Sequence, residues 1–215
     1  MRLDGYSQTL NDFQLDALRE VGNVGAGNAA TALSQLTGQR IDLSVSKVCV
    51  LPTDSIAGFL GGADTNVASV CLPMYGDITG IVLVFFPLEK VDELISMLIP
   101  NFPRNTSGEL SEMQKSALRE LGSILTGAYL NALFSFIHIQ VLHGVPELVL
   151  DMAQAILDSV LVELEEKENL AIVIESELTA LDKKLTGNFF LLPEAGSLTR
   201  LFKAFSNTLG LPGNG

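Results

Sequence analysis

The chain of 215 residues has no tryptophan, and only 13 of its residues are lysine or arginine. These basic residues form no run, and the formal net charge is −12 at pH 7, so the sequence lacks the positive surface that nucleic acids and anionic membranes require. No apolar run reaches the roughly 18 residues of a membrane span, and the start, Met1–Gly5, does not resemble a signal peptide. We therefore expect a cytoplasmic protein that binds neither nucleic acid nor membrane.

Cysteine and histidine are also scarce, with two residues of each. Cys49 and Cys71 lie in apolar, strand-like runs, and we expect buried thiols in a reducing compartment. His138 and His143 do not belong to a zinc-binding pattern of cysteines and carboxylates, so the sequence predicts no metal or other cofactor of its own.

The chain does contain an internal repeat. Residues 14–23, QLDALREVGN, return as residues 114–123, QKSALRELGS, and the match continues without a gap as far as Leu33 and Leu133. One copy is too small to bury a good core alone. We therefore predict a single domain over residues 1–215, built from internal repeats at about 10–100 and 109–210 that share a sheet about a pseudo-twofold axis.

Hydrophobic spacing predicts an α+β fold with an antiparallel sheet packed against helices. The predicted helices span 10–21, 26–36, 88–99, 109–136, 148–162 and 198–209, and the strands span 41–52, 67–73, 78–86, 171–178 and 186–193. Asn11 or Asp12 caps the first helix, and Gly38 ends the second. The small residues of 22–28 either admit another helix at close range or bend the chain. Residues 100–108 form the predicted connector between the halves, and 165–169 a turn within an acidic, solvated stretch.

A polar stripe stands out on the first helix. Asp16, Glu20 and Asn23 are spaced four and three apart, so they share one face, which we expect to meet solvent. A carboxylate there can pair with a lysine of a partner, and an amide can both donate to and accept from a water molecule. Because the stripe holds no activated nucleophile, it suits the positioning of a hydrolytic water in another protein's active site. The alternative is an ordinary solvated helix face.

The segment Glu20–Ala32, EVGNVGAGNAATA, its degenerate repeat and the duplicated layout resemble the CheC-type phosphatases of bacterial and archaeal chemotaxis. That family's motif is Asp or Ser, three residues, Glu, two residues, Asn, twenty-two residues and Pro. The resemblance implies that the helix docks into the active site of a phosphorylated CheY-like response regulator, which holds a magnesium ion. It also implies that Glu20 pairs with a regulator lysine, that Asn23 orients the water attacking the aspartyl phosphate, and that Asp16 supports both.

Both copies depart from this motif. The first has Ser46 at the proline position, which should perturb shape more than chemistry. The second keeps Ser116, Glu120 and Pro146 but has Ser123 in place of the asparagine. Losing one preorganised polar group costs about 10²–10³ in rate. We therefore predict an active first site and a weak or inert second site that still docks a regulator through Glu120.

Three other interpretations stay open. Residues 146–156, PELVLDMAQAI, resemble the family segment that binds the receptor deamidase CheD, with Asp151 at its acidic position. Their apolar residues alternatively fill the core, with Asp151 as a helix cap. The second alternative is that the chain is a non-catalytic module that captures a regulator or the deamidase. A phosphate-binding loop at Gly22, Gly25 and Gly27 is the weakest alternative, because no lysine follows at the required spacing.

Overall fold

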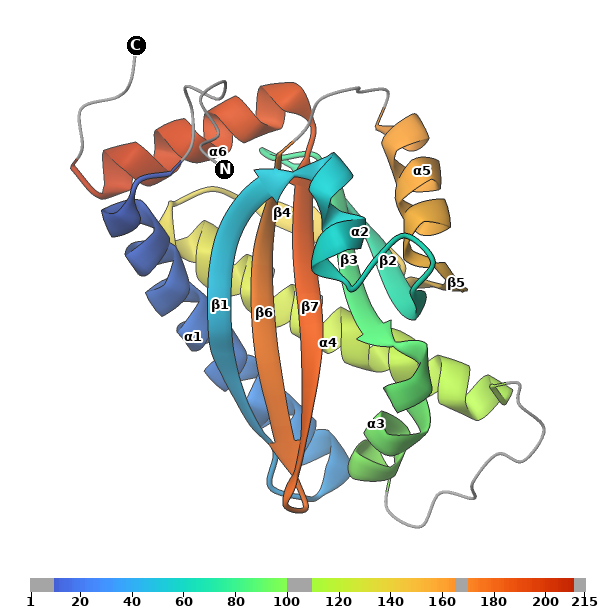
Figure 1. The fold of residues 1–215 in the computed structure, drawn as a ribbon. Helices are drawn as coiled ribbons and strands as arrows, with labels where there is room; N and C mark the ends of the chain where they lie inside the picture. The colour runs from blue at the N-terminus through green and yellow to red at the C-terminus, as the bar shows by residue number, and fades with distance from the viewer. Residues whose placement is uncertain (1–9, 100–109, 165–169, 211–215) are drawn as a thin grey trace.

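The computed structural model describes residues 10–99, 110–164 and 170–210. In these residues, helices cover both faces of a curved antiparallel sheet of seven strands (Figure 1). The elements of the first half are α1 (Asp12–Thr37), β1 (Asp42–Pro52), the 3₁₀ turn η1 (Thr53–Ser55), α2 (Ile56–Phe59), β2 (Asn66–Gly76), β3 (Gly80–Pro87), the 3₁₀ turn η2 (Leu88–Lys90) and α3 (Val91–Leu98). Those of the second half are α4 (Glu112–Phe136), β4 (Val141–His143), β5 (Glu147–Met152), α5 (Ala153–Glu163), β6 (Leu170–Ala180), β7 (Lys183–Pro193) and α6 (Ala195–Thr208).

The strand order has the symmetry of a duplication. The sheet runs β1-β6-β7-β3-β2-β4, and β5 also pairs with β2. At the centre β3 pairs with β7, and each of these strands pairs on its other side with the strand that precedes it in the chain. The outer strands cross between the halves, since β1 pairs with β6, and β4 and β5 pair with β2. This order confirms the predicted fold class.

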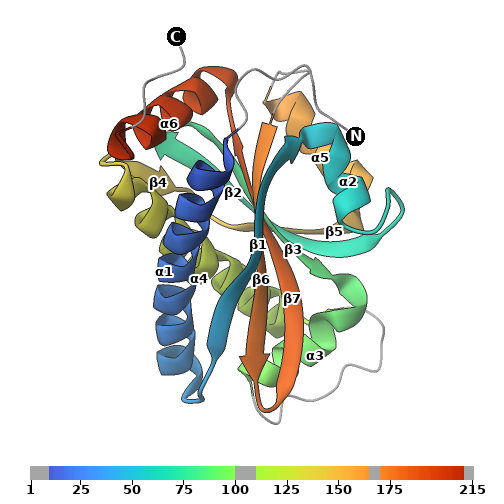
Figure 2. The same ribbon diagram turned by 60° about the vertical axis from the view of Figure 1, so that its left-hand side comes forward.

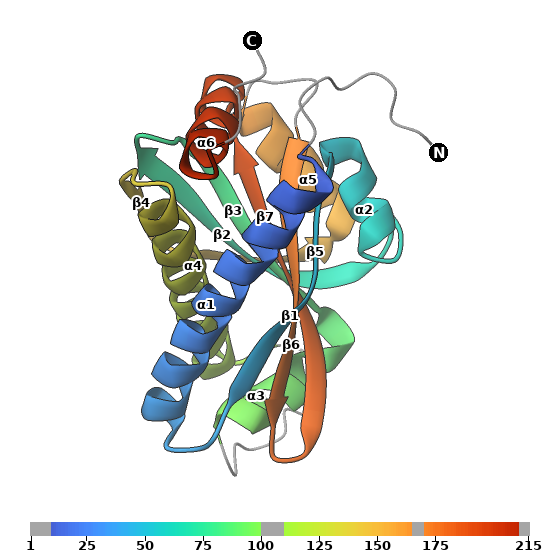
Figure 3. The same cartoon turned by 90° about the vertical axis from the view of Figure 1, so that its left-hand side faces the viewer.

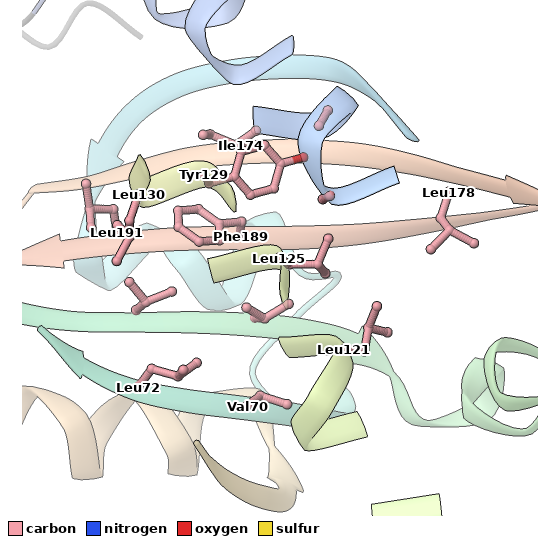
Figure 4. Packing of buried hydrophobic residues seen from close by; sticks show 14 of the residues in the cluster. Val70, Leu72, Leu121, Leu125, Tyr129, Leu130, Ile174, Leu178, Phe189 and Leu191 are labelled. Atoms are coloured by element: carbon pink, nitrogen blue, oxygen red, sulfur yellow. The ribbon is translucent and has the colours of Figure 1, made fainter. Parts of the chain in front are cut away.

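The sheet carries a separate apolar layer on each face. The helices α1 and α4 cross on one face (Figure 3), where Leu125 of α4 packs toward Phe189 of β7 (Figure 4). On the other face α2 and α5 cover a second layer. In this layer the rings of Phe85 and Phe190 meet edge to face, with 5.4 Å between their centroids. Each fully buried side chain of this size stabilises the fold by about 1.5–3 kcal/mol.

One continuous helix, α1, replaces the two predicted helical runs. Asn11 caps its start through a reciprocal pair of bonds with Gln14, and Gly38 ends it in the left-handed conformation, with φ of 68°. The chain does not bend at residues 22–28. A Cβ on Gly25 would lie 2.7 Å from Cδ1 of Tyr129 in α4, so Gly25 permits the close approach of the second helix.

The helix predicted over 148–162 is wrong in its first part. Residues 147–152 form the strand β5, whose Asp151 lies opposite Val67 of β2, and the helix α5 begins only at Ala153. An apolar run of this length does not distinguish a strand from a helix, and here pairing with β2 satisfies the backbone. Leu150 and Met152 are 39% and 42% exposed, so they do not fill the core, and Asp151 does not cap the helix.

Other expectations can be compared briefly with the structure. Phe189 and Phe190 are buried in β7, whereas Cys49 and Cys71, which were predicted to be buried, are only half-buried. The connector at 100–108, residue 109 of the predicted helix at 109–136, and the turn at 165–169 lie outside the described residues. Within the part of the chain that the structure describes, no helix is both long enough and apolar enough to cross a membrane.

Candidate functional site

The predicted polar stripe is exposed. Asp16, Glu20 and Asn23 are all exposed on α1, and α1 lies beside β1 (Figure 2). Within the described residues, neither Asp16 nor Glu20 forms an ion pair or a hydrogen bond through its carboxylate. Both carboxylates are therefore available to a cation on a partner.

Asn23, in contrast, is attached to the neighbouring strand. Its Oδ1 accepts a hydrogen bond from the backbone N–H of Val45 in β1, with 3.3 Å between the nitrogen and oxygen atoms. The donor is a backbone amide, so the oxygen of the carboxamide must face β1. The Nδ2 group has no partner in the described residues and is left to donate to a water or a ligand. This bond fixes the orientation of the amide before any partner arrives.

Ser46, at the motif's proline position, is the extra residue of a β-bulge. Val45 pairs with Ser176 of β6 and Lys47 pairs with Glu175, so Ser46 has no opposite residue. Its hydroxyl donates to the backbone oxygen of Glu175 at 3.1 Å and lies 2.7 Å from the carboxylate Oε1 of the same residue. Bulges are common beside functional sites because they redirect the backbone. Here the bulge follows directly after the N–H that holds Asn23.

An open groove runs between α1 and β1 beside this bond. Its volume is about 330 Å³, and its lining residues are Asp12, Leu15, Asp16, Arg19, Ser46, Lys47 and Val48. Arg19 brings positive charge to the wall, whereas the ammonium group of Lys47 lies over the ring of Phe59, 5.0 Å from its centroid. The groove offers a partner both signs of charge next to the polar stripe.

The second copy has the same scaffold without the amide. Ser116 and Glu120 are exposed on α4, and Ser123 is half-buried. Three residues, 144–146, lie between the last pair of β4 and the first pair of β5, opposite two residues of β2, so the register shifts by one residue here as well, within a segment that contains Pro146. Within the described residues, the Ser123 hydroxyl makes no hydrogen bond to Val145, the counterpart of Val45. The shorter side chain leaves this copy without the contact that orients Asn23.

The glycines do not form a phosphate-binding loop. Gly22 and Gly25 are buried inside α1, where backbone N–H groups bond along the helix. Gly22 packs against Val45, and Gly25 against Tyr129. The part of the chain that the structure describes holds no group of three or more His, Cys, Asp or Glu side chains able to bind a metal.

Sequence reasoning identified the stripe but missed two residues of the site. The contribution of Val45 is a backbone group, which no side-chain pattern reveals. Glu175 lies 129 residues from Ser46 in the chain and carries no local signal. The position of the motif's proline was the one available signal that residues near 46 belong to the site.

Comparisons with known proteins identify the family of this chain. The CheC-like family model matches residues 13–45, which include the whole stripe and Val45. The CheY-P phosphatase CheC of Bacillus subtilis is 39% identical over 204 residues, which cover 93% of this chain and 97% of that protein. The putative CheY-P phosphatase CheC1 of Halobacterium salinarum is 26% identical, over 84% of this chain and 90% of its own.

A solved structure supports the same relationship at the level of the fold. The crystal structure of Thermotoga maritima FliY aligns with a TM-score of 0.72 at 19% identity, covering 93% of this chain and 98% of that one. The match to the B. subtilis protein extends over nearly the full length of both sequences. The chain therefore belongs to the CheC-like family.

Proposed function

We propose that the protein is a phosphatase that hydrolyses the aspartyl phosphate of a CheY-like response regulator and so ends its signal. The observation that carries the proposal is the orientation of Asn23, whose Oδ1 is held by the Val45 N–H while Nδ2 stays free on an exposed face. The names of the B. subtilis and H. salinarum relatives, which describe a CheY-P phosphatase and a putative one, support the choice of substrate.

The first copy divides docking and chemistry between two side chains. Glu20, unpaired in the described chain, forms an ion pair with a lysine of the regulator and places α1 over its active site. Asn23 binds the attacking water and directs the oxygen of that water toward the phosphorus atom. The water oxygen forms the new P–O bond and loses a proton to solvent, while the bond between phosphorus and the aspartyl oxygen breaks. The products are inorganic phosphate and the free aspartate.

The remaining parts of the reaction come from the regulator. It carries the phosphoaspartate and a magnesium ion, which neutralises charge on the phosphoryl oxygens. Phosphoryl transfer depends mainly on positioning and electrostatic stabilisation. A helix with one oriented amide and one docking carboxylate therefore suffices as the contribution of this chain, and Asp16 supports both from the preceding turn.

We assign the second copy to docking without useful hydrolysis. Glu120 is exposed and unpaired in the described residues, as Glu20 is. Ser123 has neither the reach nor the paired donor and acceptor of an amide. The protein then has one active face and one face that binds a regulator weakly or unproductively.

The experiment measures phosphate release from a phosphorylated CheY-type regulator with magnesium, over a range of regulator concentrations. We expect acceleration by the unaltered protein, a raised KM in Glu20→Ala and a lowered kcat in Asn23→Ala. Glu120→Ala is the matched control and should keep most of the rate. An Asn23→Ala variant with unaltered kcat would refute the assigned chemistry. Regulator binding without acceleration would favour the non-catalytic binding module instead.

A second partner, the receptor deamidase CheD, is favoured by the exposure of β5. Leu150, Asp151 and Met152 are all exposed, with the side chain of Asp151 on the face of the strand opposite to those of Leu150 and Met152. We propose this segment as the deamidase-binding surface. Asp151→Lys should abolish co-elution with CheD and leave phosphate release unchanged, and co-elution that survives the substitution would exclude the segment.

A further inference from the structure

The backbone N–H that orients Asn23 belongs to the residue directly before the bulge of β1. The carboxamide therefore stays in place only while the bulge keeps its shape. A bulge interrupts the regular ladder, so its extra residue is less restrained than the paired residues on either side. Something other than the ladder has to fix Ser46.

The second copy shows one solution to this problem. The corresponding segment, where the register shifts by one residue within 144–146, has Pro146 at the position equivalent to Ser46, and a proline ring fixes φ near −65° by covalent means. Serine imposes no such restraint. In the first copy the restraint comes instead from the hydroxyl of Ser46, which contacts both the backbone oxygen and the carboxylate of Glu175.

Glu175 is well placed for this role. It lies on β6 opposite Lys47, directly after the bulge, and its side chain is half-buried. The 2.7 Å contact joins a hydroxyl donor to an ionised acceptor, and such bonds are stronger than those between neutral groups. The chain of contacts runs from Glu175 to Ser46, through the backbone to Val45, and from the Val45 N–H to Asn23.

We infer that Glu175 is a positioning residue for the hydrolysis, acting through Ser46 on the bulge that holds the Asn23 amide, and that this pair replaces the proline of the family motif. The inference rests on the proposed function, because it gives Glu175 a part in the same reaction. Docking of the regulator does not depend on this pair, because Glu20 lies on the helix and takes no part in these contacts.

The variants separate the hydroxyl, the carboxylate and the proline. Ser46→Ala removes both contacts and should lower kcat about tenfold, a fraction of what a full misplacement of a reacting group costs. Glu175→Ala removes only the carboxylate contact and should lower kcat about threefold, while Glu175→Gln keeps an acceptor and stays near the unaltered rate. The KM for the regulator should not change in any of them.

Rescue by proline distinguishes positioning from a general effect on folding. Ser46→Pro should retain kcat within about twofold, because the ring supplies the restraint directly. In that background Glu175→Ala should have no further effect, so the two substitutions are strongly non-additive. Glu177→Ala is the matched control, since it removes a glutamate two residues away on the same strand and leaves Ser46 untouched.

Hydrogen exchange of the Val45 amide provides a readout that does not depend on activity. Protection should fall in Ser46→Ala and Glu175→Ala and return in Ser46→Pro. Unchanged kcat and unchanged Val45 protection in Ser46→Ala would overturn the inference, as would an equal loss in Glu177→Ala. If the unaltered protein fails to accelerate phosphate release, the proposed function falls. The exchange of Val45 then decides alone whether Ser46 and Glu175 fix the bulge.

Discussion

Asn23 and Ser123 occupy corresponding positions on α1 and α4, yet only the longer side chain is bonded to its neighbouring strand. The asparagine reaches the backbone of Val45 and keeps an amide nitrogen for a second partner. The serine hydroxyl makes no such bond in the described residues. A difference of a few atoms thus separates an oriented amide from an ordinary half-buried hydroxyl, while the surrounding scaffold stays the same.

A buried polar contact joins α4 to β6 inside the core. The hydroxyl of Tyr129 in α4 lies 2.6 Å from that of Ser176 in β6, and burial raises the pKa of Tyr129 to about 12 (Figure 4 shows the ring). The unfolded chain ionises near the ordinary value of 10, so between these two pH values it is the unfolded state that releases the proton. The stabilisation that depends on the neutral Tyr129 side chain is therefore fully present below pH 10 and is lost as the pH rises toward 12.

Urea unfolding at several alkaline pH values tests this assignment. The free energy of unfolding should fall by up to about 2–3 kcal/mol between pH 10 and 12 through this one group. Tyr129→Phe should lower stability by about 1–2 kcal/mol at pH 7, because the Ser176 hydroxyl loses its partner, and should reduce the alkaline decline. The exposed Tyr75 supplies the control, and a decline as steep in Tyr129→Phe as in Tyr75→Phe would show that Tyr129 is not responsible.

At the scale of elements, the crossing of α1 and α4 depends on a glycine. Gly25 and Gly27 lie in the same helix and have opposite surroundings. A Cβ on Gly25 would meet the side chain and the Cα of Tyr129 at 2.7 and 3.1 Å, whereas a Cβ on Gly27 would meet nothing within 4 Å. Packing against α4 therefore requires glycine at position 25, whereas packing imposes no constraint at position 27.

This contrast predicts opposite changes in stability. Gly25→Ala should destabilise the protein by about 1–3 kcal/mol, because the helices must separate or Tyr129 must move. Gly27→Ala should stabilise it by about 0.5–1 kcal/mol, because alanine loses less backbone freedom in a helix. Chemical unfolding of both variants at pH 7 is the measurement. Destabilisation of similar size at both positions would mean that the crossing is not what requires Gly25.

Local patterns predicted most elements, and they failed where tertiary contacts decide. The strand around Val45 followed from alternation, those around Val70 and Val84 from apolar runs, and the helix ends from Asn11 and Gly38. The continuity of α1 did not follow, because α4 makes the small residues favourable. Nor did β5, since an apolar run becomes a strand only where an edge such as that of β2 is free to pair with it.

The candidate site was predictable to the same extent. Spacing alone placed Asp16, Glu20 and Asn23 on one exposed face, as the structure confirms. The contact between Asn23 and Val45 spans 22 residues and depends on the bulge, and Glu175 belongs to the other repeat. Contacts between repeats leave no periodic trace in the sequence, so only the structure reveals them.

On the scale of the whole molecule, α1 and α4 occupy equivalent places in the two halves of the chain. The sheet order is preserved when the halves are exchanged, and α1 and α4 lie side by side on the same face (Figures 2 and 3). Each helix has its own strand segment with a shifted register and its own exposed glutamate. The scaffold is symmetric, and the asymmetry that matters for the proposed reaction lies in the residues at 23 and 123.

The most direct test of this account compares Asn23→Ser with Ser123→Ala in phosphate release at saturating phosphorylated regulator. The first substitution gives α1 the residue of α4, and the second removes the hydroxyl of α4. We predict that Asn23→Ser lowers kcat by about 10²-fold or more, while Ser123→Ala stays within about twofold of the unaltered protein. Equal losses in the two variants, or a larger loss in Ser123→Ala, would contradict the assignment of the chemistry to the first copy.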